Sequence, residues 1–302
     1  MSDTLNYIGE KIATNIKDLL NHLCVHYRLH WRAKDLDSLR TKIETKCKTN
    51  GKDYYSKNGR KVQDILGFRI TTYFYDDVKV LWEIFHEVFD VVDEEYDIEQ
   101  STVFEPLRKN MVCRMPPKLA LLHHDLCQKD SDYALTDATY EIQFRTTLSE
   151  GWHEIDHALR YKCKTDWDKH EDEERAFNGI FAALEANDRM LKSLFDDLAY
   201  DHYKHEKWEA LLRTKFRLHF CNTPPFSLSN ILKDHHEWAK SIIRCDRNTL
   251  LKRMVKNRLF VPMTYDNLFW MIMYFEEPKD KELRKLIPKR LIEDWDMKTN
   301  AI

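Results

Sequence analysis

One stretch of the chain, residues 139–162, changes its hydrophobic period partway along and constrains the fold more than any other segment. Its first part alternates polar and apolar residues, which is typical of a strand with one buried face. The polar positions are Glu141, Gln143 and Arg145. Its second part has apolar residues three or four apart, as an amphipathic helix does. These apolar positions are Leu148, Trp152, Ile155 and Leu159. The polar strand face could be one wall of a charged-ligand site or only the solvated face of an edge strand.

The rest of the pattern predicts an α+β fold with a mixed β-sheet and helices packed on it. The predicted elements, in chain order, are helices at 3–29 and 30–48, a strand at 65–74, a helix at 76–89, strands at 91–98, 108–114 and 119–124, and helices from 168 onward, near 230–257 and at 264–276. We expect three consecutive segments: a core at 1–165, helices packed on that core at 166–221, and a helical C-terminal extension of unknown role at 222–302.

Charge and cysteine content narrow the class of protein. The formal net charge is −3, so the chain as a whole is not a polybasic nucleic-acid binder, and any such contact must come from a local patch. The seven cysteines are scattered and form no CxxC pair, which predicts reduced thiols in a cytoplasmic protein. The N-terminal residues lack the apolar core of a signal peptide, and no apolar run approaches membrane-spanning length, so we expect no membrane partner.

Three blocks of sequence carry a family resemblance. They read RAKDLDSLRTK at 32–42, DILGFRI at 64–70 and EIQFRTTLSEGWHEIDHALRYK at 141–162. In this order they resemble the synthetase region of the RelA/SpoT alarmone synthetases, whose corresponding patterns are RxKxxxSxxxK, D(I/L)xGxRI and E(V/I)QIRT followed by W, H and YK. The resemblance covers roughly residues 25–165. It implies a nucleotidyltransferase-like synthetase core.

The resemblance also implies a reaction, in which the β,γ-diphosphate of ATP moves to a ribose hydroxyl of an acceptor and AMP is released. Asp64 and Glu141 would hold Mg²⁺, and Glu141 could accept the proton of the attacking hydroxyl. Gln143 would complete the catalytic group. Guanidinium planes stack well on adenine, whereas ammonium and hydroxyl groups suit phosphates. The implied ATP-binding residues are Arg32 and Arg69 on the adenine, Lys34, Ser38 and Lys42 on the phosphates, and Arg145 and His157 in the same pocket.

The acceptor side of the family pattern is altered. The family places Tyr-x-Ser-x-His in a loop where the Tyr stacks on guanine, but the corresponding region here reads QSTVFEPLRKNMVCRMP. If Asn110 occupies the His position, Arg108 replaces the Ser and Pro106 replaces the Tyr, with Phe104 nearby. A proline has no aromatic face on which a purine can stack. The acceptor could therefore be GDP or GTP, an adenosine nucleotide, or the 3′ end of tRNA.

Two kinds of function stay open. The resemblance implies a small alarmone synthetase or one of the toxin relatives, some of which modify the tRNA 3′ end or make adenosine alarmones and are restrained by an antitoxin. The expected partners are nucleotide substrates, with tRNA and an antitoxin or other regulatory protein as further candidates. The alternative is a catalytically inactive synthetase-fold module that binds nucleotide, RNA or a partner protein.

Two further motifs have competing interpretations. Residues 153–157 match the HExxH pattern of zinc proteases, but no well-placed third ligand follows, and the family resemblance explains the helix without zinc. Residues 240–258 are rich in basic side chains, which fit either a solvated basic helix or a contact with an RNA backbone. The candidate RNA contacts are Arg244, Arg247, Lys252, Arg253 and Lys256.

Overall fold

The computed structural model describes residues 3–56, 59–97, 109–221, 226–227, 229–277 and 280–300. The chain divides into two compact units, and each is built from segments that are not contiguous in sequence. The first unit comprises Met1–Asp18, Tyr27–Tyr73 and Phe85–Ala186. The second comprises Leu19–His26, Phe74–Ile84 and Asn187–Ile302. The sequence had instead suggested three consecutive segments with boundaries at 165 and 221.

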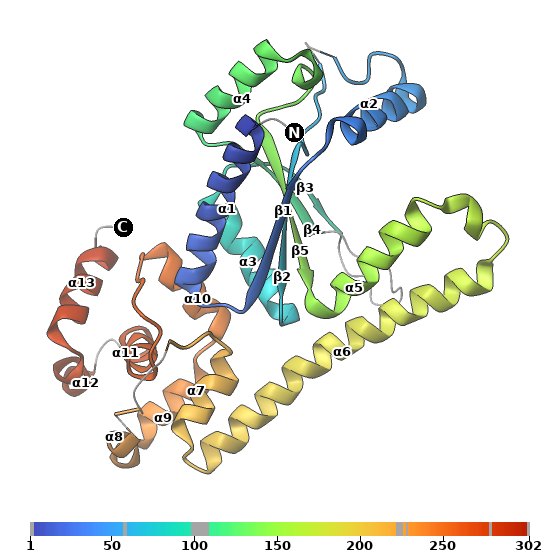
Figure 1. Ribbon diagram of the computed structural model, residues 1–302. Coiled ribbons are helices and arrows are strands. Elements are labelled where there is room, and N and C mark those ends of the chain that lie inside the picture. The colour runs from blue at the N-terminus through green and yellow to red at the C-terminus, as the bar shows by residue number, and fades with distance from the viewer. Residues whose placement is uncertain are drawn as a thin grey trace. The chain divides into compact units, whose positions relative to one another are not determined.

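Figure 1 labels the elements along the chain. The strands are β1 (Tyr27–Ala33), β2 (Leu66–Thr72), β3 (Val91–Tyr96), β4 (Lys109–Arg114) and β5 (Thr139–Thr146). The helices up to residue 216 are α1 (Asp3–Leu23), α2 (Leu36–Asn50), α3 (Tyr75–Val88), α4 (Pro117–Lys129), α5 (Thr147–Ile155), α6 (Glu171–Lys204) and α7 (Trp208–Phe216), with short turns at Ser131–Tyr133, Asp156–Tyr161 and Lys164–Trp167. The later helices are α8 (Ser229–Asp234), α9 (His236–Arg244), α10 (Arg247–Lys256), α11 (Tyr265–Glu276), α12 (Lys281–Leu286) and α13 (Lys289–Asn300).

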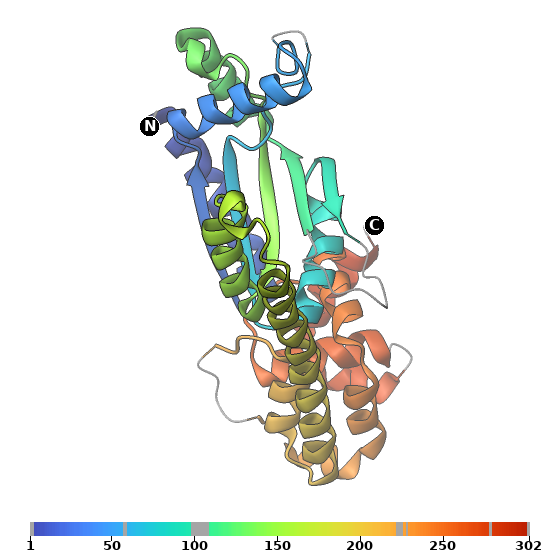
Figure 2. The same cartoon turned by 90° about the vertical axis from the view of Figure 1, so that its right-hand side faces the viewer.

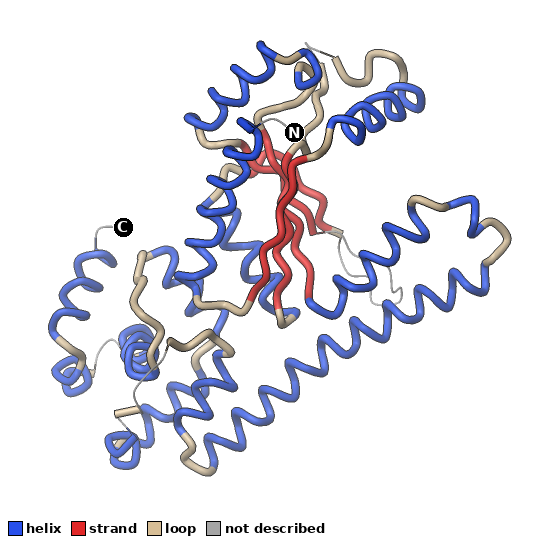
Figure 3. Tube along the Cα trace, viewed as in Figure 1, coloured by secondary structure: helices blue, strands red, loops and turns tan. Residues whose placement is uncertain are grey.

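The first unit contains a five-stranded mixed sheet in the order β1-β2-β5-β4-β3 (Figure 3). The strands β2 and β5 run parallel, and the other neighbouring pairs are antiparallel. This confirms the predicted α+β class with a mixed sheet and flanking helices. The strand that carries Glu141, β5, is the central strand and not an edge strand, so its polar face lies in the middle of the sheet.

One face of this sheet is apolar and forms the core of the first unit. Phe68, Ile142 and Phe144 project from it, and each is at most 1% exposed. Helix α1 covers this face, while α5 lies on the opposite side of the sheet (Figure 2). Gly9 of α1 permits the close packing, because a Cβ built on Gly9 would overlap the ring of Trp31 on β1. The opposite face of the sheet is left to polar side chains.

Two predicted elements have the wrong type. Residues 30–48 were expected to be one helix, but the chain is a strand up to Ala33 and becomes helical only at Leu36. The alternation of exposed and partly buried residues along β1 follows a period of two, which a helix does not have. Residues 119–124 were expected to be a strand but lie in α4, where Leu119, His123 and Leu126 are buried at helical spacing.

The passage from β5 into α5 follows its predicted pattern at first and then departs from it. The side chain of Thr146 caps α5 by accepting from the backbone N–H of Ser149, and the serine hydroxyl is bonded to Thr146 in return. Trp152 is buried as expected, but Ile155 and Leu159 are 50% and 61% exposed. The helix becomes π-helical over Asp156–Tyr161. The longer turn rotates later side chains away from a 3.6-residue stripe.

The second unit is helical within the described residues. Its centre is α11, where Leu268, Phe269, Met271, Ile272 and Met273 have no exposed surface. Two ion pairs are also buried in this unit. Arg247 Nη1 lies 2.5 Å from Asp77 Oδ1, and Arg217 Nη2 lies 2.6 Å from Asp76 Oδ2. None of the described helices combines the length and apolar character needed to cross a membrane.

Candidate active site on the polar face of the sheet

Asp64, just before β2, is held by two lysines from different elements. Lys34 follows β1, and its backbone N–H donates to the carbonyl of Ile65 at 2.8 Å, which joins the ends of the two strands. Lys42 lies on α2. The Nζ atoms of Lys34 and Lys42 both donate to Oδ2 of Asp64, each at 2.6 Å. The second carboxylate oxygen, Oδ1, is buried and accepts no hydrogen bond. Asp64 therefore has one oxygen doubly paired and the other without a partner.

The pKa values follow from this arrangement. Burial would raise the pKa of Asp64, but the charges of Lys34 and Lys42 outweigh it, and the pKa is lowered. Burial lowers the pKa of Lys34 despite the nearby carboxylate. Burial also favours a lower pKa for Lys42, but the charge of Asp64 and its hydrogen bond together outweigh burial, and the pKa of Lys42 is raised. Asp64 is consequently an ionised carboxylate at neutral pH.

Glu141 lies on β5 beside an open space over the sheet. It pairs with Gly67 of β2, and Gly67 pairs in turn with Arg32 of β1. Side chains of directly paired residues share one face of a sheet, so Arg32 and Glu141 flank Gly67 on the polar face. A Cβ built on Gly67 would meet no atom within 4 Å. Because Gly67 has no side chain, there is room on the polar face between the side chains of Arg32 and Glu141.

Burial raises the pKa of Glu141. A hydrogen bond from Gln143 opposes the rise, and the negative charge of Asp64 adds to it. The two carboxylates, 77 residues apart in sequence, thus lie within electrostatic reach of one another. Lys34 and Lys42 also act on Glu141 by their charges. A pair of carboxylates with a pair of ammonium groups is the central cluster of this site.

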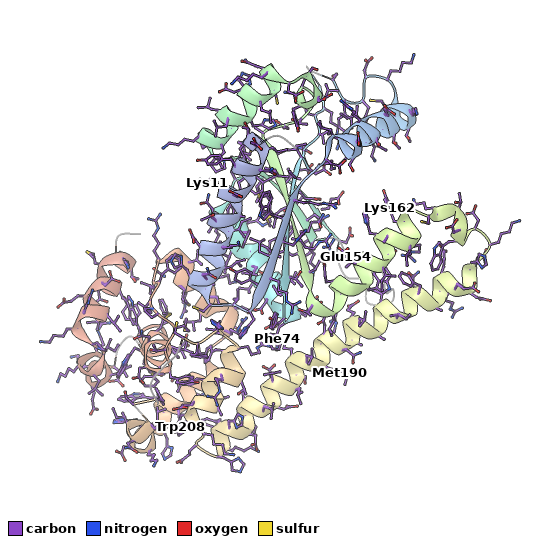
Figure 4. The ribbon with its side chains drawn as sticks, viewed as in Figure 1. Lys11, Phe74, Glu154, Lys162, Met190 and Trp208 are labelled. Carbon is purple, nitrogen blue, oxygen red and sulfur yellow. The ribbon has the colours of Figure 1, made fainter. Side chains whose placement is uncertain are left out.

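A hydrogen-bonded chain crosses the polar face from β2 to β5. Arg69 Nε donates to Gln143 Oε1 at 3.3 Å, and Gln143 Nε2 donates to Glu141 Oε2 at 2.8 Å. The amide accepts on one side and donates on the other, which assigns its orientation. Arg69 Nη1 also donates to Glu150 at 2.6 Å and to Glu154, both on α5. Figure 4 shows Glu154 on the side of α5 that faces the sheet. Arg69 is therefore anchored at three carboxylate or amide groups.

The other expected ATP-binding residues have identifiable local roles. The hydroxyl and the backbone N–H of Ser38 both donate to the carboxylate of Asp35, which caps α2, each at 2.8 Å. Arg145 Nη1 donates to the carbonyl of Phe144 at 2.8 Å. His157 lies on the π-helical turn, and its ring stacks on that of Tyr161 with centroids 5.9 Å apart. Burial lowers the pKa of His157, and the positive charges of Lys162 and Arg32 lower it further.

The acceptor-loop candidates are only partly within the described residues. Phe104 and Arg108 lie outside them. Asn110 lies on β4, pairs with Gln143 of β5 and is 8% exposed. Its Oδ1 accepts from Arg145 Nη2 at 3.4 Å. Asn110 therefore belongs to the same polar face as the catalytic candidates.

The HExxH segment does not form a zinc site among the residues that the structure describes, where no group of three or more His, Cys, Asp or Glu side chains could hold a metal. Glu154, which would be the general base if the segment were a zinc protease site, is ion-paired with Arg69. His153 packs on the ring of Phe181, with centroids 5.8 Å apart. Burial and the charges of Arg145 and Arg69 lower the pKa of His153 to about 3, so its imidazole is neutral at physiological pH.

The predicted RNA contacts on the second unit are unequal. The prediction is wrong for Arg247, because its side chain is 5% exposed and its guanidinium pairs with Asp77, so it cannot reach an RNA phosphate. Lys252 pairs with Glu83 at 2.8 Å, and Arg253 pairs with Glu276 at 3.0 Å. Of the five candidates, Arg244 and Lys256 are exposed and have no salt bridge among the described residues.

Sequence reasoning overlooked the acidic side of the site. Glu150 and Glu154 both bind Arg69, and one buried oxygen of Glu150, Oε2, accepts no hydrogen bond. Their spacing of four residues at the start of a helix that follows a polar strand was a usable signal, because such residues share one helix face. His153 was considered only as a zinc ligand. The charges that lower its pKa, those of Arg145 and Arg69, come from two strands and could not be inferred from spacing.

The residues around Asp64 fit a magnesium ion by their chemistry. Mg²⁺ prefers oxygen ligands, keeps several waters and commonly binds through one or two carboxylates together with substrate phosphates. Asp64 Oδ1 is a buried carboxylate oxygen without a partner, and Glu141 lies within electrostatic reach of it. These two carboxylates, completed by phosphate and water oxygens, match that ligand set. A site built from three protein carboxylates is not present among the described residues.

Comparison with known proteins gives the class. Residues 31–166 match the family model described as "Region found in RelA / SpoT proteins". This segment, which includes the end of β1, all of β2 to β5 and both carboxylates, is similar to the region found in RelA/SpoT proteins. No curated protein sequence matches the chain.

Solved structures offer a weaker likeness. A GTP pyrophosphokinase family protein from Streptococcus pneumoniae is 18% identical, with a TM-score of 0.48, over 65% of this chain and 91% of the other. The small alarmone synthetase 1 of Bacillus subtilis bound to its product pppGpp is 19% identical, with a TM-score of 0.48, over 65% of this chain and 95% of the other. The same synthetase bound to AMPCPP is 19% identical, with a TM-score of 0.43, over 64% and 92%. At this level the likeness assigns neither substrate nor residue roles.

Proposed function

We propose that the chain is an ATP-dependent pyrophosphokinase that transfers the β,γ-diphosphate of ATP to a ribose hydroxyl. One observation carries the proposal: Asp64 is hydrogen-bonded to Lys34 and Lys42, and the charges of these three residues act on Glu141, which flanks the open position at Gly67. Two carboxylates next to two ammonium groups suit a metal-bound polyphosphate. The match of residues 31–166 to the RelA/SpoT region supports the same reaction.

In this reaction the hydroxyl oxygen of the acceptor forms a bond to the β-phosphorus of ATP. The bond from that phosphorus to the oxygen bridging to the α-phosphate breaks, and AMP leaves with the bonding electron pair. Glu141 accepts the hydroxyl proton, and burial, which raises its pKa, makes it a stronger base than an exposed glutamate. Gln143 orients Glu141 through its hydrogen bond. Magnesium, when bound by Asp64 and Glu141, would neutralise charge on the phosphate oxygens.

The donor nucleotide is placed by the basic side chains of the same face. Lys34 and Lys42 bind its phosphates, and Arg32 and Arg69 contact the adenine over Gly67, where the sheet has no side chain. Ser38 is exposed, but its hydroxyl already donates to Asp35 and would have to leave that carboxylate in order to donate to a phosphate. Arg145, which lies on β5 four residues after Glu141, and His157 on the π-helical turn complete the proposed binding residues.

The acceptor is proposed to be a nucleotide or RNA end that needs no tyrosine for stacking. Purified protein with γ-labelled ATP is incubated with separate pools of GDP, GTP, ADP, ATP and tRNA, with magnesium. Label that appears in one acceptor pool, together with an equal amount of AMP, would support the transfer reaction and identify the acceptor. Both products should be absent with the Glu141→Gln variant. Absence of label and AMP in every pool contradicts it.

A tRNA acceptor makes a separate prediction for the exposed cations of the second unit. Binding of tRNA should weaken with salt and fall further when Lys256 is changed to Glu. The matched control is Lys17→Glu on α1, an exposed lysine in another part of the sequence. Equal loss in both variants would indicate a general charge effect and argue against a tRNA surface at Lys256.

A toxin role is a further part of the proposal, with an antitoxin or another regulatory protein as the restraint and the cytoplasm as the place of action. Expression of the wild-type chain in bacteria should arrest growth, and Glu141→Gln should not. Arrest by both proteins would contradict a role that depends on the transfer reaction.

The alternative is a synthetase-fold module that binds a ligand without turnover. It is favoured by the closed pairing of Arg69 with Glu150 and Glu154, which leaves this guanidinium less available for a base. Nucleotide binding without AMP formation in any acceptor pool would support this module.

A further inference from the structure

We propose that Lys34 and Lys42 occupy the metal-binding carboxylate of Asp64 in the ligand-free protein, so that a divalent cation binds only together with the triphosphate of ATP. The inference rests on the proposed function, because it concerns the donor site. It assigns the lysines a second role: they hold Asp64 before ATP arrives and bind phosphate afterwards.

The first support is the geometry of the ion pairs. Both Nζ atoms contact the same oxygen of Asp64, Oδ2, at 2.6 Å, and the three side chains are between 18% and 32% exposed. Two charge-assisted hydrogen bonds of this length at a partly shielded carboxylate compete with any ion for that oxygen. Only Oδ1 has no partner. A cation at Oδ1 would lie next to two ammonium groups.

The second support is the balance of formal charge. Asp64 and Glu141 supply two negative charges, and Lys34 and Lys42 supply two positive ones, so the cluster of four is neutral. A divalent cation that enters alone leaves this partly buried cluster with an uncompensated double positive charge, which the reduced dielectric makes costly. The triphosphate brings several negative charges with the cation. It also offers the two lysines new oxygen acceptors, which releases Asp64.

The third support is a contrast between cations of the same unit. Arg69 is fastened by Glu150, Glu154 and Gln143, so it has little freedom to exchange partners. The lysines have a single carboxylate partner at the end of a long flexible side chain, and they come from two different elements. Flexible ammonium groups are suited to moving from a carboxylate to a phosphate.

The experiment measures metal binding directly and needs no turnover. The probe is Mn²⁺, titrated calorimetrically into the protein alone and in the presence of AMPCPP, whose α,β-methylene bridge the transfer reaction cannot break. In the wild-type chain, Mn²⁺ should bind weakly alone and about tenfold or more tightly with AMPCPP. In Lys42→Met, Mn²⁺ alone should bind about tenfold more tightly than in wild type, and AMPCPP with Mn²⁺ should bind more weakly.

The control is Arg40→Met, which removes one positive charge from the same helix. Arg40 pairs with Asp132 at 2.8 Å and does not contact Asp64. It should leave both titrations unchanged. Lys34→Met is the second variant and should act as Lys42→Met does, so that a folding defect in one, detected by its thermal unfolding, leaves the other as the test.

The outcomes separate the two proposals. Wild-type binding of Mn²⁺ alone with the affinity seen in the lysine variants overturns the inference, and the proposed function stands if AMPCPP binds. Tighter Mn²⁺ binding in Arg40→Met as well would attribute the effect to overall charge and also overturn it. Absence of AMPCPP binding by the wild-type chain, with or without Mn²⁺, would overturn the proposed donor site and the inference with it.

Discussion

Filling the space above Gly67 should affect stability and nucleotide binding in opposite directions. Gly67 lies inside β2, where a Cβ would meet no atom within 4 Å, and its backbone is not in the left-handed region. Replacing a glycine at such a position reduces the entropy of the unfolded chain and stabilises by about 0.4–1 kcal/mol. Gly67→Val, with a β-branched side chain suited to strands, should therefore raise the unfolding midpoint by about 2 °C.

The same valine would stand between Arg32 and Glu141, where the adenine of the donor is proposed to lie. Forcing a ligand against an added side chain costs about 1–3 kcal/mol, which corresponds to roughly five- to 150-fold in affinity. Calorimetric titration with AMPCPP and Mn²⁺ measures this loss, and thermal unfolding measures the gain in stability.

Gly179→Ala is the matched control. Gly179 is an exposed residue within α6, with nothing near its position for a Cβ, so alanine should stabilise the helix by up to about 1 kcal/mol without affecting the nucleotide. Unchanged AMPCPP affinity in Gly67→Val would refute the placement of the donor over this strand. A lowered midpoint for Gly67→Val would show that the space above Gly67 is not open.

Three further predictions concern folding and pH. Gly9→Val should lower the free energy of unfolding by about 1–3 kcal/mol, because the valine side chain would overlap Trp31. Adding Trp31→Leu to this variant should recover part of the loss. Denaturant unfolding measures both, and no recovery in the double variant would contradict the packing of Gly9 on Trp31. Asp77→Ala should cost about 3–5 kcal/mol by leaving Arg247 buried without its partner, whereas Asp90→Ala, which removes an exposed partner of Arg114, should cost less than about 1 kcal/mol in the same assay. His153 has a folded pKa of about 3, below the ordinary value of 6.5, so its contribution to stability is present above pH 6.5 and is lost as the pH falls toward 3. His153→Phe should therefore reduce the loss of stability between pH 7 and pH 5 by up to about 2 kcal/mol, and an unchanged pH dependence would show that His153 is not a buried neutral imidazole.

Spacing was informative where one face of an element is buried. The alternation around Glu141 predicted β5 correctly, because apolar Tyr140, Ile142 and Phe144 rest on the core while the polar residues between them do not. It was misleading at residues 30–48, where polar Arg32 on an edge strand was read as part of a helix. A short strand that leads into a helix offers too few alternating residues to separate the two periods.

The candidate site was predicted as a set of residues but not as an arrangement. Asp64, Glu141, Lys34 and Lys42 were singled out from sequence, and the structure brings them together. The anchoring of Arg69 by α5 was not foreseen, and the assignment of Arg247 to an RNA surface was wrong because Asp77 buries it. Both errors concern long charged side chains, whose partners depend on elements that are distant in sequence.

Local pattern predicted most of the strands and helices and the mixed sheet, because these follow from residue type and from periods of two or 3.6 residues, whereas the choice of carboxylates and cations rested on the three sequence blocks that resemble the RelA/SpoT family. Tertiary structure decided that two lysines share one oxygen of Asp64, that an open position separates Arg32 from Glu141, and that Arg69 is held by two glutamates. These features depend on the register between strands and on the packing of helices against them. Register and packing minimise the free energy of the whole chain, so no single segment contains them.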